Sequence, residues 1–90
     1  MPEIFDRVAA VIRTTFKQPG LQVLPETTAD DVDGWDSLAH AKLLLNIERE
    51  FKIHFLIADV LDLENVGELC VAVAAASLTA LGRDQEPPNA

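Results

Sequence analysis

Apolar residues recur at helical spacing in three separate segments of this 90-residue chain, and this pattern limits the possible folds more than any other feature. In the first segment the repeat is carried by Ile4, Phe5, Val8, Val11, Ile12 and Phe16. Steps of three and four residues place such side chains on one face of a helix. Pro2 suits a first turn, and Pro19 and Gly20 are expected to end the helix. The segment therefore predicts an amphipathic helix over residues 2–16.

Residues 37–51 carry the second helical pattern, with Asp36 as the expected N-cap. Four apolar residues should face the core: Leu43, Leu44, Ile47 and Phe51. A core-facing stripe needs only somewhat more than about 100° of the helix surface. Leu38, Ala41 and Leu45 lie at the edge of that arc, so we expect them to be partly exposed. We interpret this strip as a surface for a partner. The alternative is that isolated exposed leucines carry no function.

The third helical pattern covers about residues 66–81. Asn65 is the expected N-cap, and Glu68, three residues on, completes a pattern like a capping box. Gly82 is expected to close the helix. Its buried stripe is predicted to be Val66, Leu69, Cys70, Val73 and Ser77 or Leu81. Cys70 is therefore interpreted as a small core residue rather than a reactive thiol.

Two connecting segments have no helical period. Residues 17–36 are rich in proline, glycine and acids, and an irregular segment of that length is unusual in a small domain. Its attachments to the core are predicted to be Leu21, Val23 and Leu24, with Trp35 anchoring its end against the bundle. Residues 52–64 predict an extended connector followed by a short helix near residues 57–62. We therefore expect one all-α domain over residues 1–82, a four-helix bundle of three main helices and one short helix with a long first loop. The polar residues 83–90 should be a disordered tail.

The charge balance excludes several classes of partner. Fifteen acids against seven lysines and arginines give a net charge of −8, which opposes binding to nucleic acid or anionic lipid and favours partners with basic surfaces. No apolar run approaches the ~20 residues of a membrane span, and the N-terminus does not resemble a signal peptide. The single cysteine cannot form an internal disulfide. These features predict a cytoplasmic monomer.

Ser37 falls at the first position of the second helix. Backbone N–H groups without helical partners point outward there, and the helix dipole favours a negative group. The hydroxyl is therefore well placed to carry a phosphoryl-linked group. Serine is also a common residue at helix starts, so its position alone does not demand that role.

Other readings of this region fit less well. In "DDVDG", taking Gly34 as the sixth position of a calcium loop puts Ala29 first and His40 twelfth, so the leading aspartate and the bidentate glutamate are missing. Asp36, Ser37 and His40 match a hydrolase triad in type, but they lie on one helical turn without an oxyanion hole. Two histidines and one cysteine give no zinc spacing. We therefore predict no catalytic residues and no metal ligands.

The chain resembles the acyl carrier and peptidyl carrier proteins in three stretches, "GWDSL", "IEREFKIHF" and "NVGEL". The resemblance covers roughly residues 3–81. It implies a four-helix bundle with a long first loop, and a 4′-phosphopantetheine arm attached to Ser37 from coenzyme A by a separate transferase. Asp36 and Leu38 match positions that the transferase recognises. The helix after the serine would be the main docking surface for partner enzymes.

The docking helix departs from the carriers of fatty acid synthesis. Where those proteins usually have acids, this chain has Ala39, Lys42 and Arg49, and Asn46 occupies a position that is usually small or apolar. The expected docking residues are Ala41, Lys42, Leu45, Glu48, Arg49, Asp59 and Asp62. We therefore expect a discrete acyl, aminoacyl or peptidyl carrier in a specialised polyketide, nonribosomal peptide or related pathway. Its partners would be the transferase, a loading enzyme and downstream synthase or tailoring enzymes. The alternative is a helical interaction module of the same fold that never receives the arm.

Overall fold

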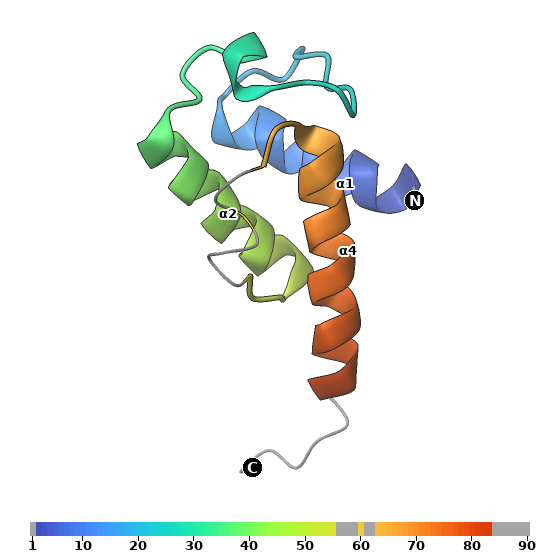
Figure 1. The fold of residues 1–90 in the computed structure, drawn as a ribbon. Helices are drawn as coiled ribbons and strands as arrows, with labels where there is room; N and C mark the ends of the chain where they lie inside the picture. The colour runs from blue at the N-terminus through green and yellow to red at the C-terminus, as the bar shows by residue number, and fades with distance from the viewer. Residues whose placement is uncertain (1, 56–59, 61–62, 84–90) are drawn as a thin grey trace.

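The computed structural model describes residues 2–55, 60 and 63–83, and this part of the chain is helical without strands (Figure 1). It contains α1 (Pro2–Thr15), a 3-10 turn η1 (Ala29–Asp31), α2 (Ser37–Phe51) and α4 (Val66–Arg83). The all-α prediction is confirmed. The short helix predicted near residues 57–62 and the predicted docking residues Asp59 and Asp62 lie outside the described residues, as do residues 84–90 of the predicted tail.

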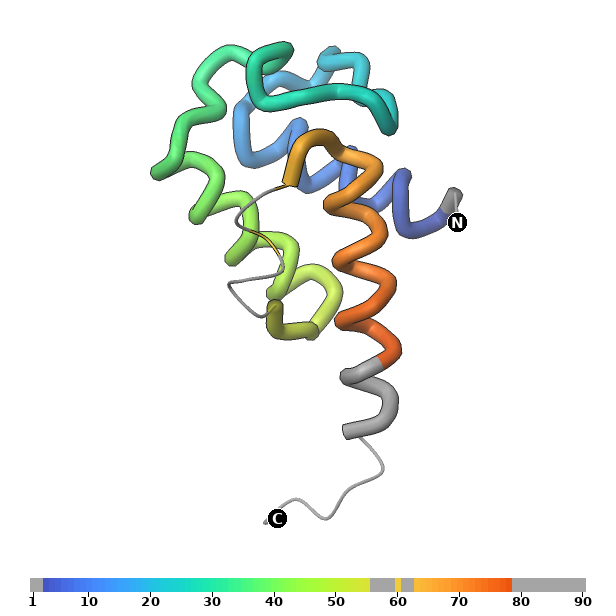
Figure 2. The backbone as a smooth tube through the Cα atoms, in the orientation of Figure 1, coloured from blue at the N-terminus to red at the C-terminus, as the bar shows by residue number. Residues whose placement is uncertain are grey.

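The three helices enclose a single apolar core. α1 packs against both α2 and α4, and the long first loop passes over the end of the bundle where α2 and α4 begin (Figures 1 and 2). The buried residues of the core are Val8, Ala9, Ile12, Val23, Leu43, Ile47, Ile53, Val66, Leu69 and Val73. Each of the three predicted apolar stripes contributes to this list, so the helical periods correctly predicted which faces are buried.

The end of α1 differs from the prediction. The helix stops at Thr15, before Pro19 and Gly20, because Lys17 adopts a left-handed conformation with φ of 55°. The N–H of Gln18 donates to the carbonyl of Arg13 at 2.9 Å, and the N–H of Lys17 donates to that of Thr14 at 3.2 Å. This pair of bonds is the Schellman arrangement, which satisfies the last carbonyls of a helix.

α2 begins and ends as the sequence predicts. Asp36 is the N-cap, and its Oδ1 accepts a 2.8 Å hydrogen bond from the N–H of Ala39. The helix ends at Phe51, after which Lys52 turns the chain through a left-handed conformation with φ of 57°. The chain then places Ile53 in the core.

The boundaries of α4 are predicted correctly at its start and incorrectly at its end. Asn65 Oδ1 accepts from the N–H of Glu68 at 2.9 Å, which confirms the cap. The Glu68 carboxylate accepts from the N–H of Glu64 at 3.3 Å, one residue before the donor that a standard capping box would use. The helix continues to Arg83, so Gly82 does not close it.

The first loop is attached to the bundle mainly through its backbone. Pro25 and Thr27 each turn a carbonyl to the start of α4, where they accept from the N–H groups of Gly67 at 2.7 Å and Val66 at 2.9 Å. A side chain at Gly67 would bring its Cβ within 3.1 Å of the Pro25 oxygen, so glycine permits this close approach. The first loop thus satisfies two N–H groups that a helix start leaves without partners.

One predicted anchor of the first loop is wrong. Val23 is buried and Leu21 packs against the core, but Leu24 is 41% exposed. The Leu24 N–H donates to Thr27 Oγ1 at 2.9 Å, and its carbonyl accepts from the Thr27 N–H at 3.0 Å. This tight turn leaves Leu24 at a corner facing solvent. The buried residues in its place are Thr27 and Val32, and neither was predicted.

Candidate functional site

Ser37 lies at the first residue of α2 and is exposed, as are its neighbours Asp36 and Leu38. The Asp36 carboxylate caps the helix through the N–H of Ala39, and its carbonyl accepts from the N–H of His40 at 2.8 Å. The helix start is therefore rigidly formed while the serine hydroxyl remains accessible. The first N–H groups of a helix have no acceptor within the helix, so this end favours an anionic group on the serine.

The surface that runs from Ser37 along α2 is apolar and exposed. Leu38 is 82% exposed, Leu45 is 53% exposed, and Ala41 between them is also exposed. We call these three residues the apolar strip. On the opposite side, Leu43 and Ile47 are fully buried. The predicted division of α2 into a core face and an exposed strip is confirmed.

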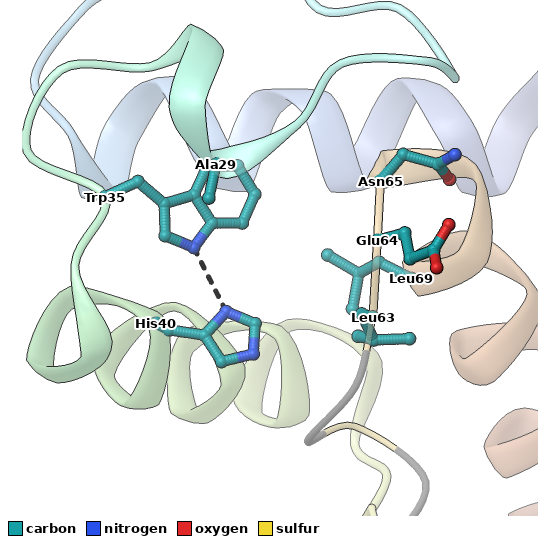
Figure 3. Close-up of a pocket in the computed structure, with 7 residues that line it drawn as sticks. All are labelled: Ala29, Trp35, His40, Leu63, Glu64, Asn65 and Leu69. Carbon is teal, nitrogen blue, oxygen red and sulfur yellow. Dashed lines mark hydrogen bonds between the residues drawn. The ribbon is translucent and has the colours of Figure 1, made fainter.

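Trp35 and His40 link the first loop to α2 (Figure 3). The indole Nε1 of Trp35 donates to His40 Nδ1 at 3.1 Å, and the indole ring lies 5.3 Å from that of Phe16 between ring centres. An indole N–H can only donate, so Nδ1 of the imidazole accepts and Nε2 carries the proton. His40 Nε2 then donates to the carbonyl of Val60 at 3.2 Å. The prediction that Trp35 anchors the loop is confirmed.

The role of His40 was not predicted. Both of its ring nitrogens are engaged in holding Trp35 and residue 60, so the ring is not free to act as a base towards Ser37. The hydrolase reading therefore has no support in the geometry. No sequence signal could have identified the second contact, because the acceptor is a backbone carbonyl 20 residues away.

A small cavity lies between Trp35 and His40 on one side and residues 63–65 and Leu69 on the other (Figure 3). Its volume is about 40 Å³. That space admits a few water molecules at most. Its lining is partly polar, since Glu64 and Asn65 contribute to it. A cavity of this volume has no room for an acyl chain of the kind that the resemblance implies.

Two of the polar residues on α2 make contacts within the molecule. The Asn46 side-chain amide donates to Thr15 Oγ1 at 2.9 Å, so this residue joins α2 to α1. Glu48 Oε2 accepts from the N–H of Phe55 at 2.8 Å and lies 3.9 Å from His54 Nδ1. His54 itself is exposed. The structure thus leaves Lys42 and Arg49 as the exposed charged residues among the predicted docking positions on α2.

Cys70 lies half-buried on α4, against the core. Burial raises the pKa of its thiol above the ordinary value, which keeps the sulfur protonated and unreactive near neutral pH. The predicted packing role is therefore confirmed. Within the described part of the chain, no group of three or more histidines, cysteines or acids is arranged to hold a metal ion. None of the described helices combines the length and the apolar character that a membrane-spanning segment needs.

Comparison with known proteins gives one informative match. No protein-family model matches the chain, and no curated protein matches it by sequence. Among solved structures, it is similar to the solution structure of a holo acyl carrier protein from Geobacter metallireducens, with 31% sequence identity and a TM-score of 0.80. The match covers 97% of this chain and 97% of the other, so it extends over the whole bundle.

Proposed function

The chain belongs to the acyl carrier protein family, and we propose that Ser37 is the residue that carries its 4′-phosphopantetheine arm. Proteins of this family hold such an arm covalently and are carriers rather than catalysts. The observation that carries the assignment is an exposed serine hydroxyl at a well-formed helix start. The phosphodiester of the arm bears a negative charge, which the helix dipole and the unpaired N–H groups stabilise.

The surroundings of Ser37 suit attachment by a separate enzyme. Asp36 and Leu38 are both exposed beside it, so a phosphopantetheinyl transferase can reach the hydroxyl and contact both neighbours. The chain has one other serine, Ser77, which lies half-buried within α4 and is a poor competitor. Coenzyme A is the donor: the serine oxygen forms the new bond to phosphorus, and adenosine 3′,5′-bisphosphate leaves.

The biological role that follows is delivery of a cargo held as a thioester on the terminal sulfur of the arm. We place the carrier domain at residues 1–82 of a monomeric cytoplasmic protein. A loading enzyme, and then synthase or tailoring enzymes, would meet the arm along the apolar strip. Exposed Lys42 and Arg49 on the same helix favour a specialised polyketide, nonribosomal peptide or related pathway over general fatty acid synthesis.

The test is the intact mass after incubation with coenzyme A and a transferase of broad specificity. Wild-type protein should gain one phosphopantetheinyl group, and the Ser37→Ala variant should gain none. Ser77→Ala is the matched control and should be modified like the wild type. If Ser37→Ala still gains the group, the assignment is wrong.

A second candidate function is a helical interaction module that keeps the fold without the arm. The exposed apolar strip would serve such a module equally well. Wild-type protein that remains unmodified while an authentic carrier in the same reaction is fully converted would favour this alternative.

A further inference from the structure

The charges of α2 are divided in an unexpected way. Its two acids are both engaged within the molecule: Glu48 accepts from the N–H of Phe55, and Glu50 pairs with Arg7 at 3.1 Å. Its bases, Lys42 and Arg49, and the cap residue Lys52 are exposed. None of these three side chains has an ion pair or hydrogen bond to any residue that the structure describes. On a molecule of net charge −8, this helix therefore presents positive charge to solvent.

The positive charges border an open groove at the end of α2, which we call the basic groove. It has a volume of about 490 Å³ and is lined by Leu45, Glu48, Arg49, Lys52, Ile53 and His54. Leu45 is 53% exposed and supplies apolar surface. Lys42 lies three residues before Leu45 on the same helix, and it extends the positive edge towards Ser37.

We propose that the basic groove docks an acidic surface of a partner protein. We take this partner to be an enzyme that meets the arm, and in this respect the inference rests on the proposed carrier function. An apolar side chain of the partner would contact Leu45, and its carboxylates would face Arg49 and Lys52. Charge complementarity selects this occupant, because Glu48 and Glu50 are engaged within the molecule, whereas the exposed bases Arg49 and Lys52 have no partner among the described residues. Nucleic acid and anionic lipid also carry negative charge, but the net charge of −8 repels extended polyanions.

The proposal contradicts the expectation from net charge alone, which favours a partner with a basic face. The two expectations differ because charges act over a limited distance in salt solution. Charges beyond about 10 Å are largely screened at 0.1 M salt, so the groups within the groove determine the contact. The rest of the acidic surface then acts against acidic partners that approach from any other direction.

The test is an NMR titration of the full-length, isotope-labelled chain with two matched peptides. One is an amphipathic helical peptide of leucine and glutamate, and the other has lysine in place of each glutamate. The acidic peptide should shift the amide signals of Leu45, Arg49 and Ile53, and the basic peptide should leave these signals unchanged. Equal or stronger binding of the basic peptide at the basic groove would overturn the proposal.

Two lysines in the same backbone conformation provide a matched pair of variants. Lys52 lies in the basic groove and Lys17 at the end of α1, and both have positive φ, where glycine is preferred. Lys52→Gly and Lys17→Gly should therefore both raise the melting temperature. Only Lys52→Gly should weaken binding of the acidic peptide, by about two- to fivefold, the range of one exposed ion pair. Equal affinities for the two variants would overturn the proposal.

The same labelled protein tests the other possible occupants of the basic groove, which are a second copy of the chain, a nucleic acid and an anionic lipid surface. Concentration-dependent shifts at the basic groove without any peptide would show that a second copy covers it, and would overturn the proposal. Stronger binding to a single-stranded oligonucleotide or to phosphatidylglycerol vesicles than to the acidic peptide would do so as well. Each titration is repeated on Ser37→Ala, which cannot carry the arm. Binding of the peptides to this variant does not depend on phosphopantetheine at Ser37. The titration can therefore contradict the basic-groove proposal without bearing on the Ser37 assignment, and the reverse also holds.

Discussion

The starts of α2 and α4 are built alike and covered differently. Each helix has an acidic or amide side chain that caps the N–H three residues on, Asp36 to Ala39 and Asn65 to Glu68. At α4 the carbonyls of the first loop accept from the first two N–H groups of the helix, those of Val66 and Gly67, and the side chain of Val66 is fully buried. At α2 the first helical residue is an exposed serine.

The start of α4 therefore serves the fold, whereas the start of α2 is available to a ligand. One cap is sufficient to begin either helix. At α4 the remaining N–H groups hold the first loop in place, and this contact orients the loop over the bundle (Figure 2). At α2 none of the described loop residues covers the exposed Ser37, so the positive end of the helix dipole is open to a phosphate on that residue.

The largest effect expected concerns the two faces of α2. Leu43→Ala empties a fully buried site and should lower the free energy of unfolding by about 2–5 kcal/mol. Leu45→Ala removes a side chain that is 53% exposed and should cost less than about 1 kcal/mol, while slowing delivery of cargo to a partner enzyme. Urea unfolding and the rate of enzymatic loading measure the two effects. Equal destabilisation by both variants would make the apolar strip part of the core.

The next effect compares the first residues of the two helices directly. Val66→Ala should lower the free energy of unfolding by about 1–3 kcal/mol, because it uncovers packed apolar surface beneath the first loop. Ser37→Ala should change it by no more than about 0.5 kcal/mol, since the side chain is exposed. Thermal unfolding followed by circular dichroism distinguishes them. A large loss in Ser37→Ala would mean that the serine serves folding, and the contrast between the two helix starts would fail.

A smaller effect is expected at Asp36, where two variants distinguish the capping hydrogen bond of the side chain from its negative charge. Asp36→Ala should cost about 0.5–2 kcal/mol, because the N–H of Ala39 loses its acceptor. Asp36→Asn keeps an acceptor oxygen at the same place and should be nearly as stable as wild type. If the transferase recognises the carboxylate, Asp36→Asn will still be modified more slowly. If stability and modification rate fall together in both variants, the transferase requires only that α2 is formed and does not recognise the carboxylate.

The smallest effect expected is the response to salt. Asp30, Asp31 and Asp33 are exposed in the first loop close to Asp36, so like charges lie near one another before α2. Moderate sodium chloride screens such repulsion, and the melting temperature should rise by about 2–4 °C. The measurement is a thermal scan at low and moderate salt. A flat or falling melting temperature would indicate that the contacts of Asp31 with Thr28, at 2.9 and 3.2 Å, already compensate the charge.

Features that depend on local sequence could be predicted. The caps at Asp36 and Asn65, the bounds of α2 and the two faces of α2 follow from residue type and helical spacing within a few turns. The position of Ser37 at a helix start is of this kind. The resemblance of "GWDSL" and its surroundings to carrier proteins is also local, and the structural match supports the same family.

Features that depend on distant contacts could not be predicted. The loop carbonyls of Pro25 and Thr27 meet α4 about 40 residues later in the chain, and backbone acceptors leave no trace in residue type. Leu24 was wrongly assigned to the core for a different reason: its side chain points to solvent because the backbone makes a tight turn with Thr27, and an apolar residue type does not reveal such a turn. Glu48 has the sequence position of a docking acid, but its carboxylate binds the N–H of Phe55. Only the folded connector reveals that contact.

The most direct test of the account is to locate the phosphopantetheine group on the modified chain by tryptic mass mapping. Cleavage after Lys17 and Lys42 isolates residues 18–42, which contain Ser37 and no other serine, while Ser77 falls in the peptide of residues 53–83. If Ser37 carries the arm, the whole mass gain resides in residues 18–42 and, on fragmentation, on Ser37. A mass gain in residues 53–83, or an unmodified chain beside a fully converted control carrier, would contradict it.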